Sequence, residues 1–260
     1  MPTRIWDRAG SLPVPADERP RPEIVALAPA GLPSIDELFS FMRDAERRFD
    51  TLRLRIDETS ATAAGDLVVT TEALIEHPGR ARVTTTEPGA GFSGNYDVWL
   101  SNGGRVRTYS ARDRLATDRP ARTPVRGADA IDLPGFARVY RPVTALPMES
   151  LPDLFVHPGG YCQNVLATGR CDVLGTADLV GREGILVRSA HPRSVERWAD
   201  RPDFAVELVV DRGTGCILRL TELMADAPTR DARVVVFEPD VPLPPTAFEL
   251  AVPEGTRTIF

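Results

Sequence analysis

Residues 98–109 read VWLSNGGRVRTY, and they indicate the fold class more directly than any other segment of the chain. Two runs rich in β-branched and aromatic residues flank the turn signal Ser101-Asn102-Gly103-Gly104. An Asn-Gly step supplies the positive φ angles that a tight hairpin turn requires. We therefore expect an antiparallel hairpin here, with its turn at Asn102-Gly103.

Further strands are predicted on both sides of this hairpin. In residues 52–57, Leu52, Leu54 and Ile56 alternate with charged residues, which is typical of a strand with one buried and one solvated face. The carboxylate pair Asp57/Glu58 at the end of this strand is interpreted as part of the solvated face. Similar patterns predict strands at 66–76, 80–86, 185–188, 204–210, 216–223 and 233–238. Residues 111–135 are rich in Arg, Asp, Pro and Thr and predict a long loop.

Two helices are expected. The sequence Ser34-Ile35-Asp36-Glu37 forms a capping box. The apolar residues that follow at helical spacing predict an amphipathic helix that ends near Phe49 and covers the core. The second helix is expected from Pro158 to Thr168, with Gly169 ending it. The order of helix, meander, helix and meander predicts an α+β fold of sequential antiparallel strands.

The domain organisation is predicted to be simple. Residues 1–33 contain seven prolines and little periodic apolar pattern, so they read as an extended or disordered arm. Ile24-Val25-Ala26-Leu27 is a candidate edge strand that would clip the arm to the domain. Residues 34–260 are expected to form one domain, because 42% of the 260 residues are apolar and can build a sizeable core.

The net charge and the distribution of charges limit the classes of partner that the protein can bind. The net charge is −6 and the sequence pI is about 5.2, with acidic and basic residues interleaved. This pattern argues against nucleic acid and against an anionic membrane as partners. All 31 basic residues are arginine, which is typical of a GC-rich bacterium and excludes chemistry that needs a lysine.

No leader or transmembrane stretch is recognised, so the chain as written is expected in the cytoplasm, or outside it if a leader was removed.

Catalytic chemistry is not indicated. His77, His157 and His191 each precede a proline, and no metal-ligand spacing occurs, so neither a metal nor a cofactor is expected. One nucleophile–base pair, Cys162 with His157, would flank a helix start, but Cys162 shares a helical face with Leu166 and is expected to be buried. The cysteines at 162, 171 and 216 are either three buried thiols or include a Cys162–Cys171 bridge.

The second half of the chain resembles the lipoprotein-carrier superfamily, which includes LolA, the LppX-type carriers and the N-terminal domain of RseB. The resemblance lies in Leu151 to Gly160 followed by a helix, in Val180-Gly181-Arg182 before an apolar strand, and in the turn Asp211-Arg212-Gly213-Thr214-Gly215. The ending from Phe237 to Gly255 is also similar, and residues 79–83 and 99–107 fit the family's first half. The order of these weak motifs carries the resemblance, which spans roughly residues 34–258.

This resemblance implies a strongly curved antiparallel β half-barrel with helices covering its concave, apolar face. In relatives that face holds acyl chains or hydrophobic segments of lipoproteins. From strand alternation and helix faces, nine residues are predicted to line an apolar ligand: Phe39, Met42, Leu54, Val69, Trp99, Val106, Phe155, Tyr161 and Val187.

Three functions remain open. The first is non-enzymatic binding or carriage of a lipid-like or other apolar ligand on the concave face. The second is a regulatory protein–protein module of the RseB type, which would use the arm and the 111–135 loop. The third is an enzyme or pathway protein on the same scaffold, because a fold does not determine a function.

Overall fold

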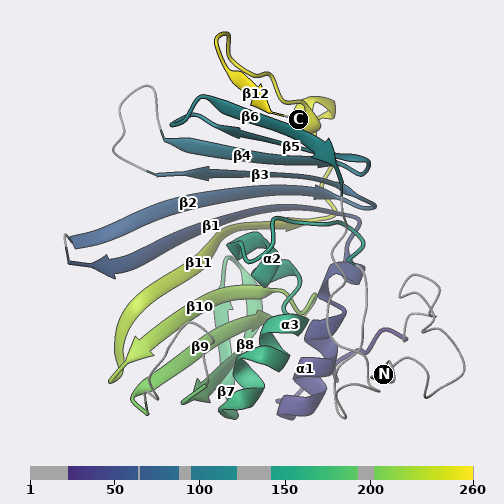
Figure 1. Ribbon diagram of the computed structural model, residues 1–260. Coiled ribbons are helices and arrows are strands. Elements are labelled where there is room, and N and C mark those ends of the chain that lie inside the picture. The colour runs from purple at the N-terminus through teal and green to yellow at the C-terminus, as the bar shows by residue number, and fades with distance from the viewer. Residues whose placement is uncertain (1–22, 64, 88–94, 122–141, 193–201, 260) are drawn as a thin grey trace, which may run out of the picture.

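The computed structural model describes residues 23–63, 65–87, 95–121, 142–192 and 202–259, and within them it shows one continuous sheet (Figure 1). The twelve strands lie in the order β12-β6-β5-β4-β3-β2-β1-β11-β10-β9-β8-β7. Neighbouring strands are antiparallel except for β12 and β6, which are parallel. The sheet is open, since β12 and β7 form its two edges.

The strands are β1 (Thr51–Thr62), β2 (Gly65–Glu76), β3 (Arg80–Thr86), β4 (Tyr96–Asn102), β5 (Arg105–Ser110), β6 (Leu115–Pro120), β7 (Arg170–Leu179), β8 (Arg182–Ala190), β9 (Phe204–Asp211), β10 (Ile217–Met224), β11 (Ala227–Pro239) and β12 (Arg257–Ile259). The helices are α1 (Ile35–Arg43), α2 (Leu151–Val156) and α3 (Gly159–Asn164). Short 3-10 turns are η2 (Ala45–Arg48), η3 (Leu166–Thr168) and η4 (Pro245–Phe248).

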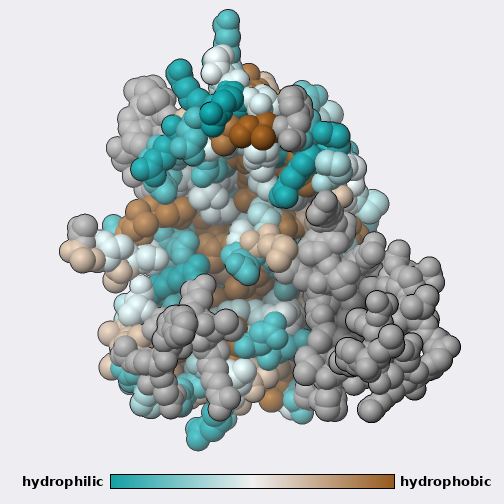
Figure 2. Space-filling model, viewed as in Figure 1, coloured by the Kyte–Doolittle hydropathy of each residue, from teal (hydrophilic) through white to brown (hydrophobic). Residues whose placement is uncertain are grey.

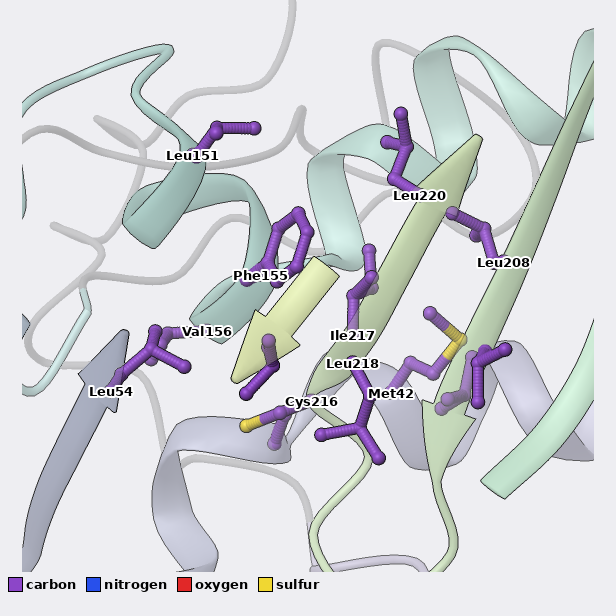
Figure 3. Packing of buried hydrophobic residues seen from close by; sticks show 14 of the residues in the cluster. Met42, Leu54, Leu151, Phe155, Val156, Leu208, Cys216, Ile217, Leu218 and Leu220 are labelled. Atoms are coloured by element: carbon purple, nitrogen blue, oxygen red, sulfur yellow. The ribbon is translucent and has the colours of Figure 1, made fainter. Parts of the chain in front are cut away.

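The main core lies between the helices and one face of the sheet. Figure 1 shows β7 to β11 curving around α1, α2 and α3, so this face is concave. Met42 of α1, Phe155 of α2 and Leu54 of β1 are all fully buried there, and Figure 3 shows them with Leu208, Ile217 and Leu220 from the neighbouring strands. Burial of these apolar side chains is the main force that holds the helices on the sheet.

The other half of the sheet is covered on its opposite face. The C-terminal segment brings Ala247 and Phe248 of η4 against Leu100 of β4, with Leu74 of β2 beside them. The guanidinium of Arg80 lies 4.3 Å from the centre of the Phe248 ring. Leu54 and Leu74 lie on opposite faces because Leu54 pairs with Ala73, one residue away. The sheet is thus packed on its concave face by helices and on its convex face by the C-terminal segment.

The first helix begins as predicted and ends earlier. The Glu37 amide donates to Ser34 Oγ and the Ser34 amide donates to Glu37 Oε2, which completes the capping box. The helix stops at Arg43, and Asp44 leads into η2, so the predicted extension to Phe49 is a 3-10 turn instead. Phe49 nevertheless remains buried in the core.

The second predicted helix, from Pro158 to Thr168, is confirmed in its bounds, because Pro158 is the N-cap of α3 and Gly169 is the C-cap of η3. It is interrupted at Val165, where α3 ends and the 3-10 turn η3 follows. The short helix α2 ahead of it is not predicted by the sequence; Ser150 caps α2 by accepting from the Asp153 amide. Pro158 separates α2 from α3, because a proline disfavours helical backbone at the residue before it.

Three smaller expectations also change. The hairpin of β4 and β5 is confirmed, but its positive φ belongs to Gly103. Asn102 ends β4, and its side-chain oxygen accepts hydrogen bonds from the amides of Gly104 and Arg105. The predicted 111–135 loop contains β6, and its remainder from 122 lies outside the described residues. Residues 24–27 form no strand.

The described part of the arm is instead held by arginine side chains. Arg48 Nη2 donates to the Val25 carbonyl at 2.6 Å, and Arg212 Nη2 donates to the Gly31 carbonyl at 2.8 Å. Leu27 packs against the main core. The remainder of the predicted arm, residues 1–22, lies outside the described residues.

Candidate functional site

The predicted lining residues fall into two groups. Five are buried, and four of these belong to the main core, at 0% or 1% exposure: Met42, Leu54, Phe155 and Val187. Val106 is also buried, on β5 and outside that cluster. A ligand can contact the four core residues only if the helices move away from the sheet. The core is therefore filled by the chain's own side chains.

The other four lining residues are half-buried. Phe39, Trp99 and Tyr161 pack on the margin of the main core. Val69 lies on β2, directly opposite Glu58 of β1. These four residues are the part of the predicted lining that a ligand can reach without rearrangement of the helices.

Val69 belongs to a surface where the concave face leaves the core. Along β1, Glu58 follows Leu54 and Ile56 on the same face, because alternate strand residues point to the same side. On β2, Leu67 lies opposite Ser60 on this face and is 46% exposed. Figure 2 shows apolar residues gathered along the β1–β2 hairpin, with hydrophilic residues beside them.

A cluster of three charged side chains adjoins these apolar residues. Arg230 of β11 donates from Nε to Glu58 at 2.5 Å and from Nη1 to Glu222 of β10 at 3.2 Å. Arg230 lies opposite both Ser60 and Glu222 in the sheet, so all three charged side chains share the concave face. Their side chains are 18–33% exposed, and solvent still reaches them.

Tyr161 of α3 lies beside the same cluster. Burial raises the pKa of its phenol, the charge of Glu222 raises it further, and the charge of Arg230 opposes this. We call the six residues Glu58, Leu67, Val69, Tyr161, Glu222 and Arg230 the hairpin patch. It combines exposed apolar surface with partly buried charge.

The sequence predicts two residues of the hairpin patch, Val69 and Tyr161, as ligand lining, and it does not predict the other four. Glu58 was assigned to the solvated face with Asp57, yet the alternation of Leu52, Leu54 and Ile56 already puts residue 58 on the buried side. That signal was present in the sequence. Arg230 and Glu222 carry no such signal, because only strand pairing brings them to Glu58.

A second polar cluster is fully buried within the fold. His157 Nδ1 lies 2.8 Å from Asp153 Oδ1, and His157 Nε2 lies 3.0 Å from Glu46 Oε2, which also accepts from the Val143 amide at 2.8 Å. Burial alone would lower the pKa of His157, but hydrogen bonds and charges of the two carboxylates raise it to about 9. A cationic imidazole therefore joins α2 to η2.

This arrangement removes the nucleophile–base pair considered from the sequence. His157 is held between carboxylates, while the Cys162 thiol points to Met42 Sδ at 3.8 Å. Burial raises the pKa of the Cys162 thiol, which keeps it protonated and unreactive. Cys162, Cys171 and Cys216 are free thiols, so the Cys162–Cys171 bridge is not formed.

In the ranges that the structure describes, no three His, Cys, Asp or Glu side chains are arranged to hold a metal ion. None of the helices in these ranges has the length and apolar character needed to cross a bilayer.

Comparison with known proteins finds similarity in three-dimensional structure but not in sequence. No protein-family model matches the sequence, and no curated protein matches it. The fold is similar to that of MucB, with 11% identity and a TM-score of 0.48 over 84% of this chain and 62% of MucB. This chain thus spans less than two thirds of MucB, which has also been solved in complex with MucA from Pseudomonas aeruginosa.

Two further matches cover nearly all of the other chain. LprF from Mycobacterium bovis matches with 9% identity and a TM-score of 0.38 over 87% of this chain and 100% of LprF. A LolA superfamily protein from Nitrosomonas europaea matches with 10% identity and a TM-score of 0.33 over 84% of this chain and 99% of that protein. The LolA superfamily is the group that the sequence motifs resemble.

Proposed function

We propose that this protein is a non-enzymatic binding protein that holds the apolar part of its ligand on the hairpin patch. The observation that carries the proposal is the position of Leu67, Val69 and Tyr161. They continue the apolar face of the core past the point where the helices cover it, and they remain exposed or half-buried. Covering such surface with an alkyl chain gains roughly 0.8 kcal/mol per buried CH₂ group.

The predicted ligand class is lipid-like or otherwise apolar. Trp99 and Phe39 lie on the margin of the same core, so they are candidates to extend the binding surface. Met42, Leu54, Phe155 and Val187 would join it only through a movement of the helices, and their role as lining stays a prediction. Val106 is also buried, so its role as a lining residue likewise stays a prediction.

The test is uptake of a neutral fluorescent apolar probe such as N-phenyl-1-naphthylamine, together with native mass spectrometry of the purified chain and of its organic extract. Leu67→Asp should abolish uptake, because it places a charge within the apolar surface. Val68→Asp is the matched control: Val68 is the next residue, is 39% exposed, and points to the opposite face of β2. A chain that carries no extractable apolar molecule and takes up no probe would exclude the proposal.

A protein–protein module is the second candidate, and one observation favours it. Leu67 and Val68 are exposed on opposite faces of the same strand end, so a partner could enclose the hairpin from both sides. The arm and the 111–135 loop, which were predicted as contact surfaces, lie largely outside the described residues. If this reading holds, Val68→Asp weakens capture of a protein partner while probe uptake stays normal.

A further inference from the structure

The described part of the arm, residues 23–33, lies against two arginine side chains of the domain. Arg48 Nη2 donates to the Val25 carbonyl at 2.6 Å. Arg212 donates from Nη2 to the Gly31 carbonyl at 2.8 Å and from Nη1 to the Ala28 carbonyl at 3.4 Å. The three acceptors are thus main-chain carbonyls at a spacing of three residues. Figure 1 shows this part of the arm beside α1, on the other side of the molecule from the free end of the β1–β2 hairpin.

The domain orients both arginines through contacts that do not involve the arm. Arg48 Nη1 donates to the carbonyls of Phe41 and Thr214, each at 2.9 Å, and its guanidinium lies 3.9 Å from the centre of the Phe41 ring. Arg212 Nε lies 2.9 Å from Glu183 Oε1 of β8. The remaining N–H donors of both guanidinium groups therefore point to where the arm lies. We call these five residues, Phe41, Arg48, Glu183, Arg212 and Thr214, the arm site.

The arm contributes little beyond its carbonyls. Leu27 packs on the margin of the main core, whereas Ile24 and Leu32 are 41% and 52% exposed. Within the described residues, no backbone–backbone hydrogen bond joins residues 23–33 to the domain. Segments near a terminus that are held by so few contacts open at a low free-energy cost. The arm can therefore leave the arm site while the arginines stay in place.

The structure shows one segment that fits the arm site, and every copy of the chain carries it. The fit needs carbonyls at positions 25, 28 and 31 and an apolar side chain at Leu27. Only Leu32 and Pro33 link this segment to Ser34, the N-cap of α1. If two copies exchange their arms, every contact of the arm site is kept, so the exchange costs little beyond bringing the copies together.

We propose that the arm site is an interaction surface for a second copy of this chain, in which residues 23–33 of one copy replace those of the other. The chain's own arm is then an internal competitor for the site. This inference is separate from the proposed function, because the arm site and the hairpin patch are different surfaces.

The first experiment measures binding of a fluorescently labelled peptide of residues 23–33 to the full chain by fluorescence anisotropy. Leu27→Asp in the chain should tighten binding of the native-sequence peptide at least about tenfold, because the weakened arm no longer competes for the site. Ile24→Asp is the matched control and should leave peptide binding unchanged, since Ile24 is exposed.

A second substitution tests the arginine donors. Adding Arg212→Met to the Leu27→Asp chain should abolish the gain, because it removes the donors to Ala28 and Gly31 and keeps the length of the side chain. Arg170→Met, at an arginine whose side chain is 84% exposed, is the control. Urea unfolding of each variant verifies that it is folded. Absence of peptide binding to a folded Leu27→Asp chain, or binding that survives Arg212→Met, would overturn the inference.

Native mass spectrometry over a range of chain concentrations then tests the second copy itself. We expect a dimer whose share rises with concentration in the native chain and in Ile24→Asp, and which is lost in Leu27→Asp and in Arg212→Met. A native chain that stays monomeric, or a dimer that persists in both of the latter variants, would overturn the assignment of the arm site to a second copy.

Discussion

His157 is a buried ionisable group that joins two elements of the helix-covered half of the molecule. Its imidazole is 1% exposed and bridges Glu46 and Asp153, which are 3% and 4% exposed at their side chains. Burial alone would raise the pKa of Glu46, but the hydrogen bond and charge of His157 lower it overall. The three groups are therefore stable only as a set.

Replacing His157 should reveal this dependence. His157→Gln leaves two carboxylates buried without a cation, which we expect to lower the free energy of unfolding by about 3–5 kcal/mol. Urea unfolding at pH 7 measures the change. Arg170→Gln, which breaks the well-exposed pair with Asp172, is the control and should have no measurable effect. Equal stability of His157→Gln and the native chain would contradict this account.

The same group predicts a pH dependence. The pKa of His157 is raised from about 6.5 to about 9 in the folded chain, so the folded state binds the proton more tightly than the unfolded state. Its stabilising contribution is complete below pH 6.5 and is lost as the pH rises through about 9. The stability difference between the native chain and His157→Gln should shrink by about 3 kcal/mol over this range. A constant difference would show that His157 is not protonated.

The three thiols should differ in reactivity. Cys162 and Cys216 are buried, and burial raises the pKa of Cys216 to about 12, whereas Cys171 is half-buried. We expect iodoacetamide at pH 8 to modify at most Cys171 in the native chain and all three after unfolding, as measured by intact mass. A chain that accepts only one label after unfolding without reductant would indicate a bridge.

At the scale of elements, two turns on neighbouring hairpins depend on each other. Gly79 ends the β2–β3 turn with φ +83°, and a Cβ built there would lie 3.0 Å from Gly103 Cα of the β4–β5 turn. Thr144 lies against the same turn and accepts from the Gly79 amide at 2.7 Å. This close approach fixes the β2–β3 turn against its neighbour.

Gly79→Ala should therefore lower the free energy of unfolding by more than the positive φ angle alone predicts. A non-glycine residue at positive φ costs about 1–3 kcal/mol, and the contact with Gly103 adds to this. Gly31→Ala is the matched control, because Gly31 has φ +87° and open space around its Cβ position. Thermal or urea unfolding should show the larger loss for Gly79→Ala. Equal losses would mean that the turn contact is unimportant.

At the scale of the whole molecule, the β1–β11 pair joins two differently packed halves. The β7–β11 half packs on the helices through Phe155, and the β2–β6 half packs on the C-terminal segment through Phe248. Because β1 pairs with both β2 and β11 over long registers, we expect the halves to unfold together.

This expectation can be tested with one substitution in each half. Phe155→Ala and Phe248→Ala remove large buried side chains, and the former should cost about 3–5 kcal/mol. In a cooperative sheet, both variants lower hydrogen-exchange protection in β5 and in β10 alike. If Phe248→Ala exposes only β4 to β6, the halves are separate units.

The sequence by itself determined most of the local structure. The capping box at Ser34, the glycine turn of the β4–β5 hairpin and the alternation in β1 depend on interactions within a few residues, so they can be recognised without the fold. Boundaries were less predictable, since Asp44 ends α1 although the apolar periodicity continues to Phe49, and the short helix α2 is not signalled by such a periodicity.

Only the tertiary structure decided which apolar residues are core and which remain open to a ligand. Alternation puts Leu54 and Val69 on the same face, but the helices cover Leu54 and leave Val69 half-buried. The pairing of Arg230 with Glu58, and of His157 with Glu46, joins residues more than a hundred positions apart. Such contacts are set by strand register and helix packing, which local sequence does not encode.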